Sequence, residues 1–178
     1  MLMPAEQNPL VARTAWEKCL CLLLVVLCLG YGETVFFHFA LNAGQADDFV
    51  DALWFFEIFR SQPDLWGKLA VLPLPNHEHI TVFNHLVYLC HYWLFGEINF
   101  FHYMVIGQLI VMLCCLVLAD WLKATVGWWY ALALSFGLFF NLFYWHASYW
   151  AMTALSNQAV ILFALLAARS GPTTSGSK

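Results

Sequence analysis

The sequence has little charge. Seven basic and eleven acidic residues make up 10% of its 178 residues, and the formal net charge is −4. The Lys and Arg residues stand singly rather than in a tract or along one helical face. Proteins that bind nucleic acid gather such residues into a basic patch. We therefore expect no nucleic-acid partner.

The chain also lacks a cysteine framework and a clear set of metal ligands. Three of its six cysteines share the first apolar stretch, one stands alone and two are adjacent: Cys19, Cys21, Cys28, Cys90, Cys114 and Cys115. No spacing among them indicates a disulfide scaffold or a zinc site. His77-Glu78-His79 also differs from the His-Glu-x-x-His spacing of a helical zinc site. No metal site is predicted, and the cofactor stays open, with a divalent metal as one alternative.

Apolar residues are abundant instead. They make up 62% of the chain, and aromatic residues make up 18%, far above the usual globular composition. This composition predicts an all-α, multi-pass integral membrane protein whose main partner is the lipid bilayer. A span needs roughly 20 apolar residues. Four stretches have that length: Cys19–Phe39, Phe100–Trp121, Val126–Trp145 and Tyr149–Ala168.

A fifth apolar stretch, Ile80–Phe95, is ambiguous. Its polar residues recur at helical spacing on one face: Thr81, Asn84, His85, Tyr88, His91 and Tyr92. Such an amphipathic helix is more typical of a membrane interface or of a polar cavity than of a span. Four spans also place Arg13, Lys18, Lys123, Arg169 and Lys178 on one side, as the positive-inside rule favours. We predict four spans, with five as the alternative.

The four-span layout gives a single membrane domain over residues 1–169. It has a cytoplasmic N-terminus and one large outer loop, residues 40–99, with amphipathic juxtamembrane helices. Residues 170–178 are predicted to be a disordered tail, because they are small and polar.

Two adjacent carboxylates begin that outer loop. Asp47 and Asp48, with Asp51, open a predicted helix that runs to Arg60. Acidic residues in a first turn suit the helix dipole, so a solvated acidic helix start is one interpretation. The other is a catalytic pair, since adjacent like charges resist joint ionisation and raise the proton affinity of one carboxyl.

The loop also carries a motif. Glu78-His79 precedes the amphipathic stretch, which ends in Leu94-Phe95-Gly96. With the acidic pair after the first span, this pattern resembles the N-terminal part of a C-superfamily polytopic membrane glycosyltransferase. It is similar to a subgroup with an Asn-Glu-His-Arg motif, from which the chain departs at His77 and Ile80. Family members are much longer, so the resemblance implies a truncated chain.

The resemblance implies transfer of a sugar from a polyprenyl-phosphate donor to an acceptor on the outer side of a bacterial inner membrane, in the cell envelope. It implies Asp48 or Asp47 as general base, with Asp48 slightly favoured. Glu78, His79, His77 and Arg60 would contact the lipid-linked sugar, although a helical pair with Glu57 is the commoner role of such an arginine.

Two other functions stay open from the sequence. The chain could be a non-catalytic membrane subunit that docks against a partner, with the acidic loop as a solvated cap. It could also be a small transporter or channel, but central charges in the spans are scarce.

Overall fold

The computed structural model describes residues 14–45, 47–76, 79–141 and 148–170. Its elements, in chain order, are α1 Ala15–Phe39, the π-helical turn η2 Phe49–Trp54, α2 Phe55–Ser61, α3 Leu65–Val71, β1 Pro75–Asn76, β2 His79–Ile80, α4 Val82–Phe95, α5 Phe100–Val126, α6 Trp128–Phe139 and α8 Ala151–Ser170. The fold is thus all-α apart from one pair of two-residue strands, as predicted.

Within the described residues, three helices are long and apolar enough to cross a membrane: α1, α5 and α8. They correspond to three of the four predicted spans, and the chain is an integral membrane protein. The fourth predicted span is helical over the 12 residues of α6, which extend about 18 Å. The hydrocarbon core is roughly 30 Å thick. The end of that predicted span, from residue 142, lies outside the described residues.

The helix α1 starts at a complete capping box and stays largely uncovered. The Thr14 hydroxyl accepts from the Glu17 backbone N–H, and the Glu17 carboxylate accepts from the Thr14 N–H. These two bonds satisfy two of the free donors of the first turn. Within the helix only Cys21 and Phe36 are buried. Because α1 packs chiefly on α6, most of its leucines are left to face lipid.

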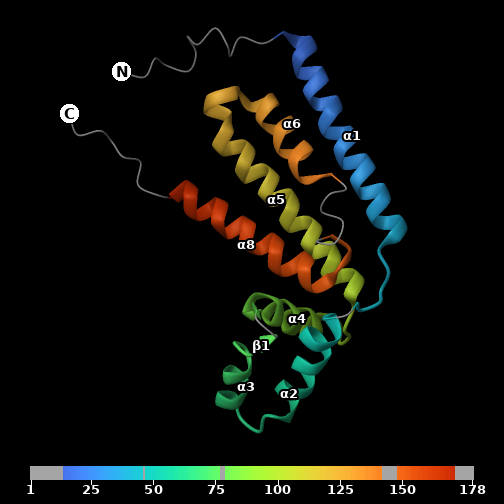
Figure 1. The fold of residues 1–178 in the computed structure, drawn as a ribbon, viewed down its shortest axis with the longest axis vertical. Helices are drawn as coiled ribbons and strands as arrows, with labels where there is room; N and C mark the ends of the chain where they lie inside the picture. Colours follow the sequence, from blue (N-terminus) through green and yellow to red (C-terminus); the bar gives the residue numbers. More distant parts are fainter. Residues whose placement is uncertain (1–13, 46, 77–78, 142–147, 171–178) are drawn as a thin grey trace, which may run out of the picture.

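The helices α5 and α8 make the most extensive helix pair of the bundle, with α5 between α8 and α6 (Figure 1). They approach closely because Gly107 has no side chain: a Cβ there would lie 2.7 Å from the Ala154 Cβ and 2.8 Å from the Ala154 carbonyl oxygen. At the other end of the pair, Arg169 Nη2 lies 2.6 Å from Asp120 Oδ2. Small residues at such a contact are the usual way that membrane helices pack tightly.

Residues 40–99 fold as a unit at one end of the bundle, which we call the juxtamembrane module. Figure 1 shows α4 lying across the lower ends of α5 and α8, with α2 and α3 beyond it. The module returns to the bundle through Gly96, whose φ of 73° ends α4, and through Asn99, whose side chain caps α5 by accepting from the His102 N–H at 3.1 Å. Left-handed φ is the conformation that favours glycine at a helix end.

The polar face of the predicted amphipathic helix turns inward. Asn84, His85, Tyr88 and His91 of α4 are all buried, whereas Trp93, Leu94 and Phe95 are among the exposed apolar residues. The helix has 14 residues and extends about 21 Å, too short to cross the hydrocarbon core. This favours the prediction that Ile80–Phe95 is not a span.

Candidate functional site

Asp48 joins the start of the juxtamembrane module to the start of α8. Its side chain is 1% exposed. Its Oδ1 accepts a 2.6 Å hydrogen bond from the Met152 backbone N–H, and its Oδ2 accepts a 3.0 Å bond from the Gln45 N–H. Met152 lies in the first turn of α8, where free N–H groups and the helix dipole favour a carboxylate. Asp48 therefore caps a membrane-spanning helix from 104 residues away.

Gln45 and Trp150 reinforce the same junction. The Gln45 carbonyl accepts from the Asp48 N–H at 2.8 Å and from the Trp150 indole N–H at 2.7 Å. The turn that carries Asp48 is thus bonded to both sides of the α8 start. Such a connection fixes the position of the module on the bundle.

Asp51, one turn later, is the centre of a buried hydrogen-bond network. It is also 1% exposed. Its Oδ1 accepts from the Thr81 hydroxyl at 2.6 Å. Its Oδ2 accepts from the Asn84 amide at 3.0 Å and from the Tyr88 hydroxyl at 2.7 Å. All three donors come from the polar face of α4, including its N-cap Thr81, so one carboxylate holds that face to η2.

His85 completes this network. Its Nδ1 lies 2.8 Å from the Leu72 carbonyl oxygen, so Nδ1 carries a proton and donates it. Its Nε2 lies 3.2 Å from Thr81 Oγ1 and 3.6 Å from Asp51 Oδ1. The Thr81 proton is already donated to Asp51, which leaves acceptors facing Nε2. The Nε2 edge of the ring therefore faces the Thr81 hydroxyl oxygen and the Asp51 carboxylate.

The two buried carboxyls have opposite electrostatic environments. For Asp48, burial is the largest effect and raises the pKa above its ordinary value of 3.8, against hydrogen bonds from the Gln45, Met152 and Ala151 backbone. For Asp51, burial also raises the pKa, but hydrogen bonds from His85, Thr81, Asn84 and Tyr88 together outweigh it and hold the pKa below 3.8. Burial and the Asp51 charge raise the pKa of Tyr88 well above its ordinary value. Asp51 is therefore the stable anion, and Asp48 the carboxyl that takes a proton more readily.

The site is closed. The cavity beside Asp51 has a volume of about 10 Å³ and is lined by η2, α2 and His85, which is room for about one water molecule. Asp48 is buried as well, and both of its oxygens accept backbone hydrogen bonds. As it stands, the arrangement can fasten helices and hold a proton, and a substrate would need a local opening to reach it.

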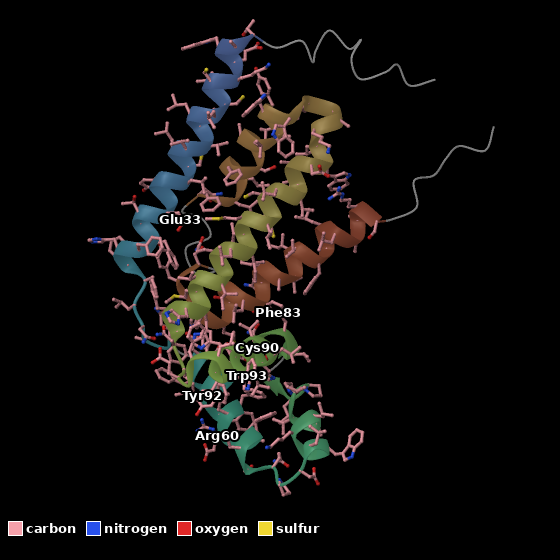
Figure 2. The ribbon with its side chains drawn as sticks, turned by 180° about the vertical axis from the view of Figure 1, so that it is seen from behind. Glu33, Arg60, Phe83, Cys90, Tyr92 and Trp93 are labelled. Carbon is pink, nitrogen blue, oxygen red and sulfur yellow. The ribbon has the colours of Figure 1, made fainter. Side chains whose placement is uncertain are left out.

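The other predicted site residues are distributed around this cluster. Asp47 is half-buried, and its carbonyl accepts from the Asp51 N–H at 2.7 Å. Arg60 lies over the Tyr92 ring, with its guanidinium carbon 4.7 Å from the ring centroid (Figure 2). This is a cation–π geometry. The structure does not bring Arg60 to the Asp48 junction.

The predicted histidine motif is described only in part. The backbone of His79 pairs with Asn76 in the strand pair, and its side chain is outside the described part. His77 and Glu78 lie outside the described residues altogether. Within residues 14–45, 47–76, 79–141 and 148–170, no cluster of three or more potential ligands could hold a metal ion.

The contact between Asp51 and the polar face of α4 is what sequence reasoning missed. A signal was present, because a polar stripe on a helix in an otherwise apolar chain needs a polar partner. The stripe Thr81–Tyr88 was recognised, but nothing in the sequence singled out the acid that would meet it.

Comparison with known proteins adds no relative. No protein-family model, curated protein or solved structure matches the chain. What the fold and the site define is therefore a class: an α-helical integral membrane protein in which one buried carboxyl, Asp48, attaches a juxtamembrane module to a spanning helix, and a second, Asp51, holds that module together.

Proposed function

We propose that the chain is the membrane-embedded part of a glycosyltransferase-like protein that moves a sugar from a polyprenyl phosphate to an acceptor hydroxyl. The observation that carries the proposal is the placement of Asp48, with Asp47 beside it in the sequence, at the junction between the module and α8. Acid–base sites are often found where burial displaces a pKa, and burial raises the pKa of Asp48, the carboxyl next to the proposed base. The resemblance of the acidic pair and the Glu78–Gly96 stretch to membrane glycosyltransferases supplies the reaction class.

The reaction needs a general base near the acceptor hydroxyl and a cationic group that binds the phosphate of the donor. The bond between the sugar C1 and the phosphate oxygen breaks as C1 bonds to the acceptor oxygen. The acceptor proton passes to a carboxylate, and polyprenyl phosphate leaves with the electron pair. A positioned base contributes about 10²- to 10⁴-fold to such a step. Arginine suits the phosphate, because its planar fork donates two bonds at once.

We assign the base role to Asp47 and a positioning role to Asp48. Asp48 is buried with both oxygens bonded, whereas Asp47 is half-buried on the same turn. Arg60, His77, Glu78 and His79 are the proposed donor contacts, and a bacterial inner membrane is the proposed location.

The test is a transfer assay on the full chain in nanodiscs, supplied with a panel of radiolabelled polyprenyl-phosphate hexoses and pentoses and with crude envelope acceptor. Asp47→Asn should lower the release of polyprenyl phosphate by about 10²-fold or more, and its melting temperature is measured alongside to show that the variant is folded. Glu57→Gln is the matched control, because Glu57 is exposed on α2, and this variant should retain full activity. Wild-type chain that releases no polyprenyl phosphate from any donor would contradict the proposal.

One observation favours a second function, that of a non-catalytic membrane subunit. Both buried carboxylates are satisfied by helix-fastening hydrogen bonds, and α1 leaves most of its apolar surface uncovered. That surface would then dock against a partner subunit. Under this alternative Asp47→Asn changes nothing, and the chain co-purifies in mild detergent with a stoichiometric partner.

A further inference from the structure

The outward side of α4 is entirely apolar, although the helix lies at the end of the bundle. Its buried polar residues donate to or accept from the module and from α8, as Asn84 does with the Met152 carbonyl at 3.2 Å. The outward residues include Trp93, 85% exposed, and Leu94, 65% exposed. Figure 2 labels Phe83, Cys90 and Trp93 along this helix. An interfacial helix usually turns its polar face to water, and α4 instead turns that face into the protein.

A recess opens on this apolar side. Its volume is about 290 Å³, and its lining comes from Leu86, Val87, Cys90, Leu94 and Phe95 of α4 and from Ile106 of α5. The imidazole of His91, which also borders the recess, is engaged elsewhere: its Nε2 lies 2.9 Å from His102 Nδ1. No charged side chain lines the recess. The volume is close to the lower end of ligand sites, roughly 300 Å³.

The recess lies at the edge of the hydrocarbon region. Ile106 is the seventh residue of the spanning helix α5, so it stands about 9 Å along the axis from the first residue. On the same helix Leu109 and Leu113, 54% and 49% exposed, continue outward-facing apolar surface further into the bilayer. Trp93 marks the opposite end, at the level where membrane proteins concentrate exposed tryptophan. The recess therefore lies beside the first turns of a spanning helix, and apolar surface continues from it along α5.

We propose that this recess, the α4–α5 groove, binds one hydrocarbon chain of a bilayer phospholipid. Two observations select that occupant. The lining offers no charged side chain or free polar group for a peptide, and the groove is continuous with the outward-facing apolar surface of the spanning helix α5. A bound chain removes from water the apolar surface that α4 exposes, at about 25 cal/mol for each Å². The groove thus anchors the juxtamembrane module to one leaflet, whatever reaction the chain performs.

The first experiment measures retained lipid. The full chain is extracted from phosphatidylcholine nanodiscs into mild detergent, and the mass of the intact protein with any bound lipid is measured by native mass spectrometry. We expect one phospholipid on the wild-type chain, and at least a five-fold smaller lipid-bound fraction after Cys90→Trp or Leu86→Trp, which fill the groove. Leu113→Trp adds the same ring at an exposed position of α5 outside the groove, and this variant should retain the lipid.

The second experiment locates the contact. Phosphatidylcholine with a diazirine in its chain is photolysed in nanodiscs, and the labelled residues are mapped by fragmentation. Labelling should be stronger at residues 86–95 and at Ile106 than along the rest of the exposed face of α5. It should decrease at these groove residues in the Leu86→Trp variant. Labelling spread evenly along α5 would overturn the proposal. So would a dimer mass that Cys90→Trp abolishes, because a second copy would then occupy the groove.

Discussion

Replacing Asp51 with alanine should loosen the juxtamembrane module, because this carboxylate joins η2 to α4. The change leaves the Thr81 hydroxyl, the Asn84 amide and the Tyr88 hydroxyl without their acceptor and removes the carboxylate that faces His85. Each buried polar group left unsatisfied costs about 1–3 kcal/mol. In a chain of this length the melting temperature should fall by on the order of 10 °C.

The measurement is thermal unfolding of the purified chain in mild detergent. Glu57→Ala is the control, since this acid is exposed on the neighbouring α2, and it should change the melting temperature by less than about 2 °C, in line with ordinary surface substitutions. Asp51→Asn keeps the size and one acceptor oxygen, so its melting temperature should fall between those of wild type and Asp51→Ala. A melting temperature for Asp51→Ala equal to that of Glu57→Ala would show that the network contributes nothing to stability.

Replacing Gly107 with leucine should separate α5 from α8. Even a Cβ at this position meets Ala154 backbone atoms at 2.8 Å and 3.0 Å, which flexible side chains cannot relieve. Overpacking in a tight contact costs about 1–3 kcal/mol or more, and here it also displaces the α8 start that Asp48 caps. We expect strongly reduced yield of folded protein and a large loss of melting temperature.

Gly137→Leu is the matched control, because a Cβ at Gly137 meets nothing within 4 Å. Size-exclusion profiles and melting curves of the two variants in the same detergent make the comparison. If both glycine variants behave like wild type, the close α5–α8 approach is not what holds the bundle together.

Three of the four predicted spans and the amphipathic helix could be predicted because each depends on local sequence. A run of about 20 apolar residues is by itself long enough to predict a membrane span. The i, i+3, i+4 spacing of the polar residues from Thr81 to Tyr92 predicts a helix with one polar face. The helix from Asp47 to Arg60 was also expected. Its first part proved to be π-helical, η2, which directs Asp51 toward α4.

The cluster itself could not be predicted, because its contacts join distant parts of the chain. Asp51 is 30 to 37 residues from its α4 partners, and Asp48 is 104 residues from Met152. In the sequence the three acids at positions 47, 48 and 51 look alike. Only packing makes one half-buried, one a helix cap and one the centre of a network.

The two environments have opposite consequences for stability as pH changes. Asp51, with a pKa lowered from 3.8, stabilises the fold above pH 3.8, and this contribution is lost as the pH falls through the folded-state pKa. Asp48, with a pKa raised from 3.8, contributes fully below that value, and its contribution is lost as the pH rises through the folded-state pKa.

The most direct test is a ¹³C NMR titration of the chain labelled at aspartate Cγ in detergent micelles, with Asp48→Asn and Asp51→Asn used to assign the resonances. The account predicts that the Asp51 carboxyl stays ionised below pH 3.8 while the Asp48 carboxyl already takes up its proton above pH 3.8. Two carboxyls that titrate together near their ordinary value would contradict it, because both would then be solvated rather than buried at the junction.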